Sequence, residues 1–324
     1  MEVKTVNPQA ALPGGTIRVE IKGLKDLLGL QVLVGGVTAD IVTASTRLLT
    51  VRIPEEGGDG LTVSNGDQDT AQLKVGNIFA SELHPVANPV VDSMGNVYVT
   101  YSGARGEKVS FGIFVVHSDG SKHPFLAEVV NPTGLAIGPD NCLYISSRHN
   151  GSIYRSTFDR QVEKYVDGLG MATGVVFDVE GNLLVGDRTG KIYRISSQHE
   201  ISVLCELEPS VSAYHLAVAP DNTLFVTGPT LSTQDCVYAV SPEGRVQIYF
   251  KGFGRPQGIG FNAHGDLQVA ASWRGRKGLY TLRKGVPELA VAGPMLVGFA
   301  YSMKNEILYL VDNANLFRID LTEG

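Results

Sequence analysis

One hairpin pattern, repeated six times, constrains the fold of this chain more than any other feature. Its clearest copy is the stretch 131–145 (NPTGLAIGPDNCLYI), in which two apolar runs flank the turn 138–141. Such runs on either side of Gly, Pro, Asp and Asn are typical of adjacent antiparallel strands. The copies begin at residues 88, 134, 174, 215, 258 and 298, which are 46, 40, 41, 43 and 40 residues apart. The chain is therefore expected to be a repeat protein from about residue 76 onward.

Each hairpin is followed by a third strand-like segment, such as 191–195 (KIYRI), and in most copies by a fourth, such as 201–204. Four antiparallel strands in a repeat of this length form one blade of a β-propeller, so six copies predict six blades over residues 76–324. The last copy ends after its third strand. We expect a strand at about residues 74–83 (KVGNIFASEL) to supply the missing outer strand and close the ring.

Residues 1–75 have a different pattern, with short strands about every ten residues separated by polar turns, which predicts a small β-sandwich. Segments 13–19 (PGGTIRV), 32–42 (VLVGGVTADIV) and 51–54 (VRIP) resemble an immunoglobulin-like domain of the IPT/TIG family over residues 6 to 75. The resemblance implies a spacer or interaction module. The fold class is thus all-β, a six-bladed propeller preceded by an immunoglobulin-like sandwich.

The repeats in residues 76–324 resemble those of NHL-repeat propellers and, more loosely, the SMP-30/gluconolactonase and strictosidine-synthase-like six-bladed group. The segments that carry this resemblance are 131–137 (NPTGLAI), 220–226 (PDNTLFV) and 255–259 (RPQGI). The resemblance implies an architecture rather than an activity, because propellers host many unrelated functions.

The composition and charge of the chain limit the kinds of partner that it is expected to bind. Hydrophobic residues make up 43% and charged residues 19% of the chain, which indicates a globular protein rather than a disordered one. The net charge of −6 and the lack of runs that combine aromatic and basic residues argue against a nucleic-acid partner. No apolar run is long enough for a membrane span, and no signal peptide is evident. We therefore expect no membrane partner and a cytoplasmic location unless a leader was removed, with the compartment itself unassigned.

In a propeller, the start of each innermost strand and the end of the next strand meet at one end of the ring, which we call the mouth. Several arginines follow second strands or precede first strands, and the single Trp is beside one of them. Guanidinium groups bind carboxylate and phosphate in a bidentate manner, and an indole ring stacks on rings or sugars. The alternative is that the arginines pair with loop acids or point into solvent. The candidate ligand-binding residues are Asn88, Arg105, Arg148, His149, Asp187, Arg188, His215, Arg255, Trp273, Arg274 and Asp312.

The SMP-30-like resemblance implies a divalent cation held by a Glu at the first blade entrance and by Asn and Asp before the repeat Gly. Here the first entrance has Asn88, and Thr133, Thr173 and Gln257 precede the glycines. Hard cations need oxygen ligands, at least one of them ionised, so this metal site is not carried over. We expect no cofactor and no metal site, with a divalent cation such as Ca²⁺ or Zn²⁺ as the alternative. A different site built from four of the candidates also stays open: His215, Asp187, Asp312 and His149. Each of them alone is also typical of a structural residue.

No catalytic residue is assigned, because the chain has no G-x-S-x-G elbow and the three cysteines match no metal pattern. The favoured function is a propeller that binds a small anionic or carbohydrate-like ligand, or a protein, at the mouth. The alternative is a diverged lactonase of the SMP-30 group with a rearranged site, so whether the protein is an enzyme is left open. A third reading gives the N-terminal sandwich a structural role in docking to another chain.

Overall fold

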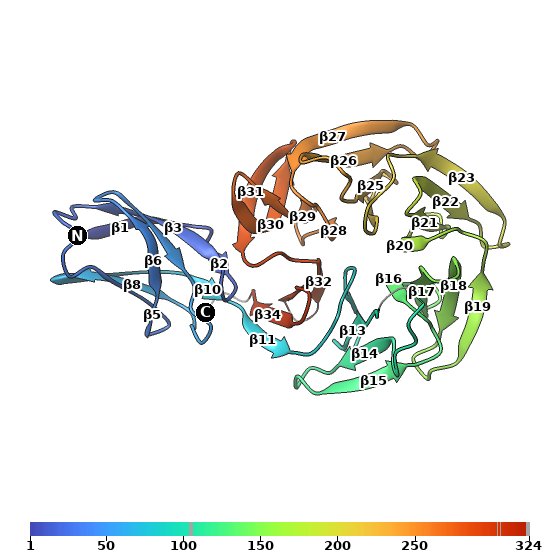
Figure 1. The fold of residues 1–324 in the computed structure, drawn as a ribbon, viewed down its shortest axis with the longest axis horizontal. Helices are drawn as coiled ribbons and strands as arrows, with labels where there is room; N and C mark the ends of the chain where they lie inside the picture. The colour runs from blue at the N-terminus through green and yellow to red at the C-terminus, as the bar shows by residue number, and fades with distance from the viewer. Residues whose placement is uncertain (104–105, 303, 305, 322–324) are drawn as a thin grey trace.

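The structure is a computed structural model that describes residues 1–103, 106–302, 304 and 306–321. Over these residues it is all-β, with no α-helix, as the sequence predicts. A two-sheet sandwich lies beside a ring of six sheets that surrounds a central channel (Figure 1). No helix in the described ranges is long and apolar enough to cross a membrane.

The N-terminal sandwich, hereafter the sandwich, has two four-stranded sheets, in the orders β1-β3-β7-β6 and β5-β4-β8-β9. Its strands are β1 (Glu2–Asn7), β3 (Thr16–Lys22), β4 (Gln31–Val34), β5 (Val37–Thr38), β6 (Asp40–Ala44), β7 (Leu48–Arg52), β8 (Leu61–Asn65) and β9 (Asp67–Ala71). In β3, Ile17, Val19 and Ile21 are buried while the residues between them face outward, because successive side chains point to opposite faces of a sheet. The assignment of this sandwich to the IPT/TIG family stays a prediction.

The ring consists of six antiparallel four-stranded sheets that follow one another along the chain, which confirms the predicted six-bladed propeller. The first three blades are β12 (Val90–Val91), β13 (Val97–Thr100), β14 (Ile113–Val116) and β15 (Lys122–Leu126); β16 (Pro132–Ile137), β17 (Leu143–Ser147), β18 (Ser152–Ser156) and β19 (Val162–Val166); and β20 (Ala172–Phe177), β21 (Leu183–Asp187), β22 (Lys191–Ile195) and β23 (Ile201–Glu206). The last three are β24 (His215–Val218), β25 (Leu224–Thr227), β26 (Asp235–Val240) and β27 (Val246–Phe253); β28 (Ile259–Phe261), β29 (Leu267–Trp273), β30 (Arg276–Arg283) and β31 (Val286–Ala292); and β32 (Gly298–Ser302), β33 (Ile307–Val311) and β34 (Leu316–Asp320), completed by β11 (Asn77–Ala80).

Strand β11 pairs antiparallel with β34 and so becomes the outer strand of the sixth blade. This segment lies within the range 74–83 and joins the two ends of the ring through hydrogen bonds between residues far apart in sequence. Two further short strands, β2 (Ala10–Ala11) and β10 (Lys74–Val75), extend the fifth blade: β2 pairs parallel with β31, and β10 pairs parallel with β2 (Figure 1). The sandwich is therefore attached to the fifth blade along a continuous sheet.

In the first, third and fifth blades, the turn inside the repeated hairpin is closed by a side chain at its first position. Asp92 Oδ1 accepts hydrogen bonds of 2.9 Å from the backbone N–H groups of Met94 and Asn96. Asp178 and Asn262 make the same two bonds in the third and fifth blades. An aspartate or asparagine that bonds to the backbone two residues on is the usual device of such turns, which explains the polar turn residues in the repeat.

The repeat glycines lie where the innermost strands of neighbouring blades approach each other around the channel. A Cβ atom on Gly134 would lie 2.3 Å from the backbone oxygen of Thr173, and one on Gly174 would lie 2.5 Å from that of Tyr214. Real Cβ atoms do not come this close to backbone atoms, so only glycine fits without a shift of one strand. The glycine that marks the repeat in sequence is thus required by packing between blades.

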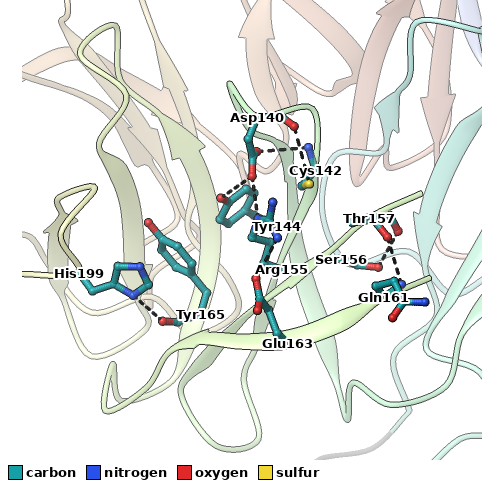
Figure 2. Close-up of polar contacts among 10 residues, drawn as sticks. All are labelled: Asp140, Cys142, Tyr144, Arg155, Ser156, Thr157, Gln161, Glu163, Tyr165 and His199. Carbon is teal, nitrogen blue, oxygen red and sulfur yellow. Dashed lines mark hydrogen bonds and ion pairs between the residues drawn. The ribbon is translucent and has the colours of Figure 1, made fainter. Parts of the chain in front are cut away.

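On the second blade, charged and aromatic side chains form a network around Asp140 (Figure 2). Arg155 bridges Asp140 and Glu163 with contacts of 2.7 and 2.8 Å, and Tyr144 Oη donates to Asp140. Partial burial acts to raise the pKa of Asp140, but the hydrogen bonds from Arg155 and from the backbone of Cys142 outweigh it and hold that pKa below the ordinary value. The network ties strands β17, β18 and β19 together and is structural in character.

Candidate functional site

A pocket of about 140 Å³ lies at the mouth, between the second, third and fourth blades. The residues that line it come from the starts of inner strands, the ends of second strands, the segment before the first blade and the loop before the fourth blade: Val86, Thr133, Arg148, Met171, Thr173, Arg188, Val211, Ser212 and Ala213. We call this the mouth pocket. It is the place where side chains distant in sequence converge as the ring topology predicts.

Arg148 and Arg188 occupy equivalent positions in neighbouring blades. Each is the first residue after the second strand, and its backbone N–H bonds to the residue before the inner strand, at 3.2 Å to Asn131 O and 3.1 Å to Met171 O. The repeat thus delivers two guanidinium groups to the same pocket. Because the positions are set by backbone pairing, the two side chains start from fixed points on a rigid scaffold.

Neighbouring carbonyl groups hold both guanidinium groups. Arg148 Nη2 donates to Gly103 O at 2.7 Å, while Arg188 donates from Nε to Ser210 O at 3.1 Å and from Nη2 to Val211 O at 2.6 Å. No described residue accepts a hydrogen bond from Arg188 Nη1, and no described carboxylate lies within ion-pair distance of Arg188. Arg188 therefore keeps its full positive charge at the pocket with donors to spare.

The far wall of the mouth pocket is the loop 208–213, which Tyr214 supports from beneath. Tyr214 is 1% exposed, and its hydroxyl donates to Glu208 O. Its backbone N–H donates to Thr173 Oγ1 at 3.1 Å, and Thr173 in turn donates to Gly186 O at 2.9 Å. Burial raises the pKa of the Tyr214 phenol, so the hydroxyl stays protonated and remains a donor. The loop 208–213 and Thr173, which lines the pocket, are thereby both bonded to the buried residue Tyr214.

The lining of the mouth pocket combines two cations, small hydroxyl residues and apolar side chains, and no acidic residue is among the described residues that line it. Arg188, whose described acceptors are neutral carbonyl groups, can offer its remaining donors to an anion in a confined site. The arrangement can bind a carboxylate or a phosphate group.

Asn88 and His215 lie instead on the central channel, a cavity of about 390 Å³ lined by the innermost strands. Asn88 links two blades, since Nδ2 donates to Ile259 O at 2.8 Å and Oδ1 accepts from Phe299 N at 3.2 Å. His215 is 3% exposed, and burial lowers its pKa to about 4. Asn88 thus acts as a clamp between blades, and His215 is a neutral ring at physiological pH.

His215 is expected to make stability depend on pH. The unfolded chain takes up the proton below about pH 6.5, whereas the folded chain does so only near pH 4, so stability is complete above pH 6.5 and is lost as pH falls toward 4. Between pH 7 and pH 5, the free energy of unfolding of the wild-type protein should fall by about 2 kcal/mol more than that of the His215→Gln variant. Urea denaturation at the two pH values measures this difference.

The matched control is His264→Gln, because His264 is an exposed histidine of the same ring. It should leave the pH dependence of the wild-type protein unchanged. A His215→Gln variant with the wild-type slope would show that the ring is protonated as easily in the folded chain as in the unfolded one.

Two acidic candidates are engaged in local turns. Asp187 is 3% exposed, and it accepts from Met171 N at 2.9 Å and from Thr189 N and Oγ1 at 3.1 and 2.5 Å. Asp312 accepts from the backbone N–H groups of Ala314 and Asn315 at 2.8 and 2.7 Å. Neither lines the mouth pocket. Their contacts are those of aspartates that close a local turn, which is the structural alternative, rather than those of residues that bind a ligand.

The remaining candidates do not converge on the mouth pocket. His149 and Arg255 are exposed. Trp273 and Arg274 line a different pocket beside the sandwich, where the Arg274 guanidinium lies 4.3 Å from the centre of the indole ring. Arg105 falls outside the described residues. Of the five arginines, two therefore share the mouth pocket, two (Arg255 and Arg274) do not line it, and Arg105 is not described.

The positions at which the SMP-30 resemblance would place metal ligands carry side chains that are occupied within the protein. Thr133 Oγ1 donates to Asn131 O at 3.3 Å, and Thr173 is bonded to Gly186 and Tyr214 as above. Among the described residues, no group of three or more His, Cys, Asp or Glu side chains is placed to hold a metal ion.

Some lining residues lacked a sequence signal. Val211, Ser212 and Ala213 belong to the connecting loop between the third and fourth blades and carry no repeat motif. Met171 and Thr173 follow from the repeat register, because they are the positions just before and within β20. The repeat pattern does not give the path of this connecting loop in space, so it could not place these three residues at the mouth pocket.

The fold is that of a six-bladed propeller with a pocket at one end that two arginines line. No protein-family model matches the chain, and no curated protein sequence matches it. Solved structures are similar in fold. A gluconolactonase from Xanthomonas campestris has a TM-score of 0.61 and 15% identity, covering 76% of this chain and 89% of its own.

Two other structures match over nearly the whole chain. An auxiliary nutrient binding protein from Bacteroides ovatus has a TM-score of 0.56 and 13% identity, covering 99% of this chain and 98% of its own. A catalytically inactive variant of virginiamycin B lyase from Staphylococcus aureus, solved with quinupristin, has a TM-score of 0.53 and 14% identity, covering 95% and 99%. At these identities the similarity concerns the fold alone. The Bacteroides match extends over the sandwich as well as the ring.

Proposed function

We propose that this protein is a binding module that holds the carboxylate or phosphate group of a small ligand, such as a sugar acid, in the mouth pocket. The observation that carries the proposal is the convergence of Arg148 and Arg188 on one pocket whose described lining contains no acidic residue. A bidentate pair between a guanidinium and a carboxylate is among the strongest polar contacts that proteins make with small ligands.

The geometry around Arg188 supports this role. Its Nε and Nη2 are fixed by the carbonyl groups of Ser210 and Val211, so the guanidinium plane is oriented before a ligand arrives. Preorganised donors bind more tightly, because less conformational freedom is lost on binding. A volume of about 140 Å³ suits the charged end of a small molecule rather than a polymer.

Similarity to a nutrient-binding protein in Bacteroides is consistent with binding without turnover. The alternative, a diverged lactonase, is suggested by the similarity to a gluconolactonase. The occupied side chains of Asn88, Thr133 and Thr173 count against it, because a metal-dependent lactonase needs free oxygen ligands on a hard cation.

The test is calorimetric titration with gluconate, an open-chain sugar acid that carries a carboxylate, and with glucose, a neutral cyclic sugar with the same number of carbon atoms. We expect gluconate to bind and glucose to bind at least about tenfold more weakly, since one charge-assisted hydrogen bond contributes about 1.5–3 kcal/mol. Arg188→Gln should weaken gluconate binding by a similar factor, while Arg188→Lys should retain part of it. Equal affinity for both ligands would overturn the proposal.

Arg255→Gln is the matched control, because Arg255 is exposed and does not line the mouth pocket. It should bind gluconate as the wild-type protein does. The lactonase alternative is tested in parallel with glucono-lactone, with and without Ca²⁺ or Zn²⁺. Turnover that a chelator abolishes would favour the alternative over a binding module.

A further inference from the structure

The hairpin of β29 and β30 reaches from the fifth blade to the sandwich. Its tip is a two-residue turn at Arg274 and Gly275, with φ values of 48° and 76°, between the paired residues Trp273 and Arg276. Two successive positive φ values match the type I′ turn, whose twist suits a tight hairpin. The turn fixes where Trp273 and Arg274 lie relative to the sandwich.

Arg276 connects this hairpin to the sandwich. Its Nη1 donates to Asn7 Oδ1 at 2.9 Å, and its Nη2 donates to Asn7 O at 2.8 Å and to Thr16 O at 3.4 Å. Tyr280 Oη donates to Arg276 O at 2.9 Å and braces the tip from within the blade. Together with the pairing of β2 on β31, these bonds hold the two parts in a defined arrangement.

Between the hairpin and the sandwich lies a pocket of about 270 Å³, which we call the junction pocket. Its apolar wall includes Trp273, Tyr280 and Leu289. Three guanidinium groups face the same space: Arg18 from β3 of the sandwich, and Arg274 and Arg276 from the hairpin. An apolar wall combined with several cations suits an organic anion better than an inorganic one.

The charges of the junction pocket are not balanced by the protein. Glu288 is the single acidic residue among the described residues that line it, and it is already paired with Arg283 at 3.3 Å. The partners of Arg276 are an amide and carbonyl groups, which carry no net charge. Partial burial lowers the pKa of Arg276, and the nearby positive charge of Arg18 lowers it further. Like charges held together at a partly buried site favour an anion between them.

We propose that the junction pocket is a second binding site, separate from the mouth pocket, that takes a small aromatic or similarly flat carboxylate. The carboxylate lies among the guanidinium groups of Arg18, Arg274 and Arg276, and the ring lies against the apolar wall. Because Arg18 belongs to the sandwich and the other two belong to the ring, the ligand bridges both parts of the chain. The proposal goes beyond the mouth pocket and does not depend on it.

Trp273 is the only tryptophan of the chain, so its fluorescence reports on the junction pocket directly. The experiment is a titration of the full chain with benzoate, with neutral benzamide and inorganic phosphate as comparison ligands. We expect a saturable change with benzoate at concentrations at which the other two give none. Arg18→Gln and Arg274→Gln should each shift the midpoint of the benzoate curve upward by about tenfold.

Arg52→Gln is the matched control, because it removes an exposed arginine of the sandwich that does not line the junction pocket. It should leave the midpoint unchanged, as should Arg188→Gln, which removes a cation of the mouth pocket. Arg18→Lys keeps the charge and should recover part of the affinity. Equal responses to benzoate and benzamide, tighter binding of phosphate, or loss of the response in Arg188→Gln would each overturn the proposal.

Discussion

Replacement of Tyr214 by alanine is expected to lower the free energy of unfolding by about 3–5 kcal/mol, the range for deletion of a large aromatic ring from a packed core. Tyr214 is 1% exposed, and it packs with Leu184, Leu216 and Val226 between the third and fourth blades. Its loss leaves a cavity and also frees the loop 208–213 that its hydroxyl holds. Chemical denaturation followed by circular dichroism measures the change.

Tyr214→Phe is the matched control, since it keeps the ring and removes only the hydrogen bond to Glu208 O. It should cost about 1 kcal/mol, the net value of a typical hydrogen bond. It should also weaken gluconate binding at the mouth pocket, because the loop 208–213 loses one of the hydrogen bonds that position it. If Tyr214→Ala were as stable as Tyr214→Phe, the ring would not have the packing role described above.

Replacement of Gly134 by alanine is the second large expected effect. The added Cβ atom would lie 2.3 Å from Thr173 O and 3.0 Å from Val175 N, both backbone atoms of the neighbouring inner strand. Because neither can move without displacing β20, we expect a loss of about 3 kcal/mol, the upper range for overpacking. Thermal unfolding of the purified variant measures it as a lowered Tm.

Gly254→Ala provides the comparison. A Cβ atom there would meet its nearest neighbour, Ser272 O, at 3.6 Å, which is an ordinary contact, and the residue has no positive φ. This variant should unfold close to the wild-type temperature. Equal Tm values for the two variants would contradict the close approach of inner strands as the reason for the repeated glycine.

The six-bladed ring could be predicted because each blade carries its own local signal. The hairpin turns need polar residues such as Asp92 and Asp178, and the inner strands need glycines such as Gly134, so both recur at the period of the blade. The extension of the fifth blade by β2 and β10 was not foreseen. Both strands are two residues long. Strand β2 pairs with β31, at the other end of the chain, and β10 pairs with β2, so no periodicity marks them.

The candidate site could be predicted only in part. The repeat register identified the end of the ring to which Arg148 and Arg188 belong, because both follow the second strand of a blade. Register does not say how far a side chain lies from the central axis. Trp273 and Arg274 follow the same rule, but the longer β29–β30 hairpin carries them to the sandwich. The repeat register also does not show which aspartates, such as Asp187, accept hydrogen bonds from the backbone of a local turn.

The measurement that tests the account most directly is a crystal structure of the protein soaked with gluconate. We expect the carboxylate in the mouth pocket, with its oxygens at hydrogen-bond distance, roughly 2.7–2.9 Å, from guanidinium nitrogens of Arg148 and Arg188. Gluconate bound instead in the central channel beside His215 and Asn88, with the mouth pocket filled by water alone, would contradict the account.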